Sequence, residues 1–109
     1  MLDYFTQQYE MVCTRLDYDM ADLIQLHEII REQLAFDNKF SDNEKKILVF
    51  YYFEDLTFKE LGEILDITES QVSLLHTNAL LKLSSGLKNN RKEIVEKLLA
   101  KHQSLEPNR

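Results

Sequence analysis

The most constraining feature of this chain is the segment Leu56–Leu83, whose residues have the pattern of two helices joined by a tight turn. Thr57 can cap the first helix, and Glu60 stands where a capping box needs its acidic residue. Thr68 and Gln71 repeat this device at the start of the second helix. The segment therefore predicts a helix-turn-helix, a layout that presents its second helix to a groove.

Both predicted helices carry apolar residues every three or four positions, as one buried helical face requires. These residues are Leu61, Ile64 and Leu65 in the first helix and Val72, Leu75, Ala79, Leu80 and Leu83 in the second. The residues that point elsewhere on the second helix are Ser70, Gln71, Leu74, Thr77 and Asn78, and we expect this face to meet a partner. Gly62 suits a close approach of the two helices. Asp66 stands at the turn position that often carries glycine, and Asp adopts the left-handed conformation more readily than most residues.

Four further helices are predicted outside this segment. Residues 2–16 and 20–36 show helical periodicity with a break at Asp17 and Asp19, and Ser41 with Glu44 forms another capping-box pattern before Ile47 and Leu48. After the Ser84–Gly86 helix end, a last helix over about residues 90–101 would bury Ile94, Val95, Leu98 and Leu99, with residues 104–109 frayed. With Gly 2, Pro 1 and no Trp, the chain is expected to be an all-α, small helical bundle that contains the helix-turn-helix.

Charge and cysteine content limit the function classes. A formal net charge of -6 argues against indiscriminate binding to nucleic acid, because neutralising phosphates supplies most non-specific affinity. Cys13 is the single cysteine, so no intramolecular disulfide and no cysteine zinc cluster can form. The first residues lack the pattern of a signal peptide, and we expect a soluble, cytoplasmic protein.

The run from Phe40 to Leu87 resembles conserved region 4 of the bacterial sigma-70 family, in its flagellar, sigma-28-like branch. The landmarks are the helix opening with Ser41 and Glu44, then YYFEDLT, KELGEIL and TESQVS…H…ALLKL at fixed spacing. On this basis the chain divides into an N-terminal helical segment (1–39), the region 4-like domain (40–88) and a C-terminal helix with a frayed tail (89–109). Further regions precede this module in a complete sigma factor, so the chain is expected to be a short natural protein, one part of a split factor or a fragment.

The resemblance implies that the second helix of the motif enters the major groove of a promoter −35 element and that the module packs on the β flap of RNA polymerase. The implied DNA-binding residues are Lys59, Thr68, Glu69, Ser70, Gln71, Ser73, Leu74, Thr77 and Lys82. The implied polymerase-binding residues are Tyr52, Phe53 and Leu56. An anti-sigma factor is a further implied partner.

The chain departs from the sigma-28-like pattern ESRVSQ at Gln71 and Leu74, and Ser84 replaces a basic residue. Losing a bidentate arginine contact to guanine costs about 1–3 kcal/mol of base discrimination. Gln71 can pair with adenine or cap its helix, and Leu74 can touch a thymine methyl or belong to a protein interface. Lys59, Lys82 and Lys88 are either phosphate contacts or solvated lysines.

Other side chains favour structural roles. The aromatic cluster Phe50–Phe53 with Phe58 can be a stacking platform for bases, but core packing is the better interpretation. His27, His76 and His102 are far apart in sequence and lack metal-ligand spacing. The sequence contains no phosphate-binding loop and no nucleophile motif. We therefore expect that the chain binds no metal ion and no cofactor and that it is not an enzyme.

The favoured function is a transcription-initiation protein whose region 4-like module docks on RNA polymerase and contacts −35 DNA. The alternative is an acidic adaptor that binds protein with little or no DNA reading, either polymerase-binding or similar to the YlxM-type proteins of the signal recognition particle system. A homodimer through the N-terminal helices around Phe5, Tyr9 and Leu16 is compatible with both functions.

Overall fold

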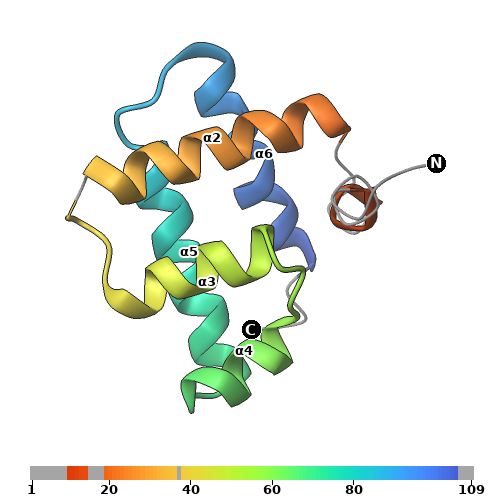
Figure 1. The fold of residues 1–109 in the computed structure, drawn as a ribbon, viewed down its shortest axis with the longest axis vertical. Helices are drawn as coiled ribbons and strands as arrows, with labels where there is room; N and C mark the ends of the chain where they lie inside the picture. The colour runs from red at the N-terminus through yellow and green to blue at the C-terminus, as the bar shows by residue number, and fades with distance from the viewer. Residues whose placement is uncertain (1–9, 15–18, 37, 106–109) are drawn as a thin grey trace.

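The computed structural model describes residues 10–14, 19–36 and 38–105, and all regular elements in these ranges are α-helices (Figure 1). Residues 10–14 are helical, and the labelled helices are α2 (Met20–Phe36), α3 (Asp42–Tyr52), α4 (Phe58–Leu65), α5 (Glu69–Ser84) and α6 (Asn89–Leu105). The predicted all-α bundle is confirmed. Of the helix predicted over residues 2–16, the structure describes only residues 10–14.

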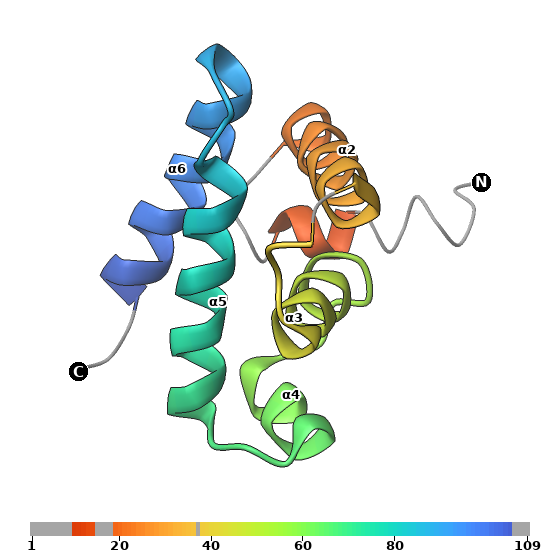
Figure 2. The same ribbon diagram turned by 90° about the vertical axis from the view of Figure 1, so that its left-hand side faces the viewer.

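The helices form two crossing layers. α2 and α3 run antiparallel across α5 and α6, while α4 lies at one end of the bundle (Figure 1). Figure 2 shows α5 running through most of the height of the molecule, with α6 returning beside it and α4 next to its first turns. This arrangement places α4 and the turn of the predicted helix-turn-helix at the end of the bundle opposite the α5–α6 loop.

The helix starts follow the predicted caps. The Asp19 carboxylate accepts a hydrogen bond from the Asp22 N–H at 2.8 Å, and α2 begins directly afterwards. Ser41 and Glu44 form the complete capping box, with bonds of 3.2 and 2.8 Å. At the other end of the chain α6 is longer than predicted, because it continues through Leu105 rather than ending near residue 101.

One hydrophobic core joins the described parts of all three predicted segments. It contains Val12 and four residues of α2, Leu48 and Tyr52 of α3, Ala79, Leu80 and Leu83 of α5, and Ile94, Val95 and Leu98 of α6. A second cluster around Ile47, Leu61 and Val72 holds α4 against α3 and α5. The helix-turn-helix is thus supported by helices that lie both before and after it in sequence.

One residue of the apolar face predicted for α4 and two apolar residues of α2 are exposed. Ile24 and Ile64 are exposed, and Phe36 is 89% exposed at the last residue of α2. Spacing of three and four includes residues at the edge of a helical stripe, and such residues can remain in solvent. In α4 the buried residues are Leu61 and Gly62, so Ile64 on the adjoining edge remains in solvent.

Candidate nucleic-acid and polymerase interface

The turn between α4 and α5 is built around Gly62 and Asp66. Asp66 ends α4 in the left-handed conformation, with φ 61°, and the Ile67 N–H donates to the Gly62 carbonyl at 2.9 Å. A Cβ on Gly62 would lie 2.8 Å from the Ile67 carbonyl oxygen, closer than real Cβ atoms approach. The predicted close approach at Gly62 and the left-handed Asp66 are both present, and together they fix the angle at which α5 leaves the turn.

Both helices of the motif begin with complete capping boxes. Thr57 Oγ1 accepts from the Glu60 N–H at 3.1 Å, while Glu60 Oε1 accepts from the Thr57 N–H at 2.8 Å. At the start of α5, Thr68 Oγ1 accepts from the Gln71 N–H at 3.1 Å and Gln71 Oε1 accepts from the Thr68 N–H at 2.9 Å. Of the two roles considered for Gln71, the capping role is therefore present in the structure, and it uses the side-chain oxygen that adenine recognition would need as an acceptor.

The residues proposed for DNA contact fall into two groups by exposure. Lys59, Thr68, Glu69, Ser70, Gln71 and Leu74 are exposed, whereas Ser73, Thr77 and Lys82 are half-buried. Leu74 is 62% exposed on the side of α5 opposite the core. The motif thus displays the first turns of α5, and the side chains on that surface are mostly small and uncharged.

A buried histidine lies behind the helix-turn-helix. The Tyr52 hydroxyl and His76 Nε2 are 2.7 Å apart, and the rings of Tyr51, Phe58 and His102 pack around His76 at centroid distances of 5.3, 5.1 and 4.5 Å. Burial, together with the nearby His102, lowers the pKa of His76 to about 3, so that it is neutral at pH 7. Tyr52 is 1% exposed, which agrees with the core interpretation of this aromatic cluster.

Two of the residues proposed for polymerase contact lie at the junction of α3 and α4. Phe53 is half-buried and stacks on His27 of α2 at 3.9 Å between ring centroids. The guanidinium carbon of Arg31 lies 5.4 Å from the same ring. Leu56 is half-buried, packs against the second core cluster and donates its N–H to the Phe50 carbonyl at 3.1 Å. Because Tyr52 is buried, Phe53 and Leu56 are the two of the three proposed polymerase-binding residues that retain surface.

Lys82 forms an ion pair with Glu44 of α3. The sequence alone suggests either a phosphate contact or a solvated lysine at this position. Lys82 Nζ lies 2.7 Å from Glu44 Oε1 and donates to the Lys39 carbonyl at 2.9 Å. Burial raises the pKa of Glu44, but the hydrogen bonds from Lys82 and Ser41 outweigh this effect, and the pKa lies below its usual value of 4.5. The pair could not be found from local patterns, because its members are far apart in sequence.

The comparisons with known proteins agree with this geometry. The family described as sigma-70, region 4, matches residues 38–85. Residues 38–85 are a sigma-70 region 4 domain. The chain is 43% identical over 49 residues to RNA polymerase sigma factor FliA of Yersinia enterocolitica, a match that covers 45% of this chain and 21% of the relative. It is 44% identical over 46 residues to FliA of Escherichia coli K12, covering 42% of this chain and 19% of the relative.

A broader match extends beyond these segments. RNA polymerase sigma-D factor of Bacillus subtilis 168 is 31% identical over 64 residues, covering 59% of this chain and 25% of the relative. The chain thus spans about a fifth to a quarter of the length of these curated relatives. No solved structure matches. The predicted sigma-70 resemblance, in its flagellar branch, is confirmed for region 4.

Region 4 is flanked by helices that pack on it from both sides. α2 contributes His27 against Phe53, and His27 Nε2 lies 2.6 Å from the Tyr52 carbonyl oxygen. At the other end of the chain, His102 Nε2 of α6 lies 3.2 Å from Ser73 Oγ of α5. The sequence pattern around His102 predicts neither a metal site nor this contact, since nothing in it indicates where α6 ends in space.

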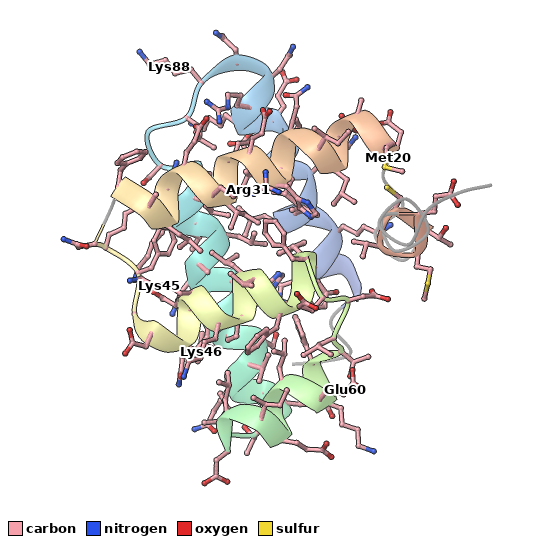
Figure 3. The ribbon with its side chains drawn as sticks, in the orientation of Figure 1. Met20, Arg31, Lys45, Lys46, Glu60 and Lys88 are labelled. Carbon is pink, nitrogen blue, oxygen red and sulfur yellow. The ribbon has the colours of Figure 1, made fainter. Side chains whose placement is uncertain are left out.

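Charge is unevenly distributed over region 4. Glu60, Glu63, Asp66 and Glu69 are exposed on α4, the turn and the start of α5, and the intervening sequence has no lysine or arginine. Lys88 lies at the opposite end of the molecule from Glu60 (Figure 3). Lys39 also lies near the end of α5, with its Nζ 3.3 Å from Ser85 Oγ. The end of region 4 that carries the turn is therefore mostly acidic, with Lys59 as an exposed lysine in the first turn of α4, whereas Lys39 and Lys88 lie at the end beyond α5.

The described residues contain no group of histidine, cysteine and carboxylate side chains that could hold a metal ion. Within the same residues, no helix combines the length and apolar character needed to cross a membrane.

Proposed function

We propose that the chain acts in bacterial transcription initiation, by binding RNA polymerase and presenting α5 to a promoter −35 element. The observation that carries this proposal is the helix-turn-helix of region 4, in which Gly62, Asp66 and two capping boxes fix α5 with Ser70 and Leu74 exposed. A helix held in this way has the form that enters a major groove. Such a protein would work in the cytoplasm, beside the polymerase.

Contacts to DNA in this proposal are few and mostly uncharged. From Ser70 to Leu81 the sequence contains no lysine or arginine, and Lys82 is bound to Glu44. Lys59, exposed in the first turn of α4, is the best-placed phosphate contact of the nine proposed residues. Because phosphate neutralisation supplies most of the affinity for DNA, we infer that polymerase must hold this module on its site.

The proposed polymerase contact uses the surface of the α3–α4 junction. Phe53 and Leu56 retain partial exposure there, and the exposed Glu54 lies between them. The β flap is the proposed partner surface, and an anti-sigma factor could compete for the same helices. The packing of His27 and Arg31 on Phe53 leaves Leu56 and Glu54 as the residues to test first.

Fluorescence anisotropy of a labelled −35 duplex tests the DNA half of the proposal, with the chain added alone and with core polymerase. The proposal predicts weak binding at low salt that becomes tight when polymerase is present. Ser70→Glu, on the exposed face of α5, should abolish binding of the duplex. Gln71→Arg should strengthen this binding about tenfold, because it adds a cation that can reach phosphate or guanine. Phe36→Ser on α2 is the matched control and should leave binding unchanged.

A second candidate function is supported by the acidic turn. Four exposed carboxylates, on Glu60, Glu63, Asp66 and Glu69, lie where a DNA-binding motif would approach phosphates. This distribution favours a protein-binding adaptor that docks on polymerase, or on another protein as YlxM-type proteins do, with little DNA reading. Polymerase binding without any change in duplex anisotropy would select this candidate over the first.

A further inference from the structure

The outward face of α5 carries two exposed leucines two helical turns apart. Leu74 is 62% exposed and Leu81 is 52% exposed. The spacing of seven places them on one face, about 10 Å apart along the helix axis at a rise of about 1.5 Å per residue. Thr77 and Asn78 lie between them on the same face, while the opposite face of α5 is buried. Figure 2 shows α6 on one side of α5 and α2 and α3 on the other.

This face is uncharged over its whole length. Between Glu69 and Lys82, α5 contains no acidic or basic residue other than His76, which is buried. Leucines repeated at a spacing of seven are the pattern with which one helix packs against another. On a chain with a net charge of -6, an uncharged face is also the surface that a second copy can approach with least repulsion.

The two ends of α5 carry opposite charges, which determines how two copies would fit. Asp66 and Glu69 are exposed at its start, whereas Lys88 is exposed beyond its end and Lys39 Nζ lies 3.3 Å from Ser85 Oγ. An antiparallel arrangement brings the acidic end of each helix to the basic end of the other and also opposes the two helix dipoles favourably. A parallel arrangement would bring like charges together at both ends.

We infer that two copies of this chain pair through α5, antiparallel, about a two-fold axis between Thr77 and Asn78. In this arrangement Leu74 of each copy packs on Leu81 of the other, because the two residues are equally far from that axis in sequence. The interface is isologous, so it closes and no larger assembly grows from it. It covers Ser70, Leu74 and Thr77, and the dimer therefore excludes DNA from the same face. The pairing depends on the exposed face and end charges of α5, and it stands whether or not the monomer reads DNA.

Sedimentation equilibrium of the full chain tests the pairing at concentrations up to about 1 mM, which detects dissociation constants in the millimolar range. We expect a monomer–dimer equilibrium for the wild-type chain and a monomer for Leu74→Ser/Leu81→Ser. The matched control, Ile24→Ser/Phe36→Ser, removes two exposed apolar side chains from α2 and should dimerise like the wild type. Because all four side chains are exposed, the variants should keep the wild-type thermal transition, which circular dichroism checks.

A wild-type chain that stays monomeric overturns the inference. So does a dimer that survives in the α5 double variant, because the contact then lies elsewhere, as in the predicted pairing through the N-terminal helices. A monomer whose α5 face binds the −35 duplex would assign the face to DNA alone. None of these results decides whether polymerase binds, so failure of the dimer is distinguishable from failure of the proposed function.

Disulfide trapping tests the antiparallel geometry. Asn78→Cys lies beside the proposed axis and should form an intermolecular disulfide under mild oxidation. Ser70→Cys should not, because two copies of residue 70 would lie about 22 Å apart along the helices, and disulfides need Cα atoms within about 7 Å. The wild-type chain is the background control, since Cys13 is buried. Cross-linking at both positions would contradict the antiparallel arrangement.

Discussion

The Lys82 ammonium lies 2.7 Å from the Glu44 carboxylate, and this pair ties the end of α5 to the first turn of α3. The carboxylate is almost fully buried, and it also accepts the Ser41 N–H at 2.8 Å to complete the α3 capping box. One charged contact thus connects the start of α3 in the first layer with α5 of region 4 in the second. Loss of the lysine would leave a buried carboxylate without its cation.

Lys82→Ala should lower the free energy of unfolding by about 1–3 kcal/mol, because the remaining buried charge loses its strongest partner. Urea denaturation at pH 7 measures this change. Lys59→Ala, which removes an exposed lysine from α4, is the control and should change stability by less than about 0.5 kcal/mol. Equal effects of the two substitutions would show that the Glu44 contact contributes little.

The cap of α5 should contribute measurably to stability. Thr68→Ala removes the oxygen that accepts the Gln71 N–H and should cost about 1 kcal/mol. Thr68→Ser keeps that oxygen and should cost much less. Thermal denaturation of the two variants beside the wild type compares them, and a matching loss in Thr68→Ser would mean that the methyl group, rather than the hydrogen bond, matters.

Substitutions at Gly62 and Asp66, the two residues around which the turn is built, should change the stability of the chain in opposite directions. Gly62→Ala places a Cβ 2.8 Å from the Ile67 carbonyl oxygen, a backbone atom, and should destabilise the chain by about 1–3 kcal/mol. Asp66→Gly should stabilise it by about 0.5 kcal/mol, since φ is 61° there and glycine adopts this conformation without strain. Chemical denaturation measures both, and a stabilised Gly62→Ala would contradict the close packing of the turn.

Acid should destabilise the chain through His76. Its pKa is about 3 when folded and about 6.5 when unfolded, so between these values the unfolded chain binds more protons and stability falls as pH falls. The slope from this residue is at most about 1.4 kcal/mol per pH unit. His27, whose pKa is also lowered by burial, acts in the same direction. Urea denaturation from pH 7 to 4 measures the slope, which His76→Phe should reduce; an unchanged slope would exclude His76 as its source.

The local elements of this fold were predictable from sequence because their signals are local. Ser41, Thr57 and Thr68 each act on residues within one turn, and all three caps are present as expected. Contacts between distant segments were not predictable: the Lys82–Glu44 pair, the His102–Ser73 contact and the stacking of His27 on Phe53 depend on how helices cross. The placement of the candidate site on α5 stays a prediction, while the burial of Tyr52 and the ion pair of Lys82 became visible only in the structure.

Binding of core RNA polymerase to the immobilised chain tests the central claim most directly. We predict saturable binding by the wild type and by the control Phe36→Ser. We also predict weakened binding by Leu56→Ala and by Glu54→Lys, the second of which changes only an exposed side chain at the α3–α4 junction and so keeps the fold. A wild-type chain that is folded by circular dichroism and yet does not bind core polymerase would contradict the account.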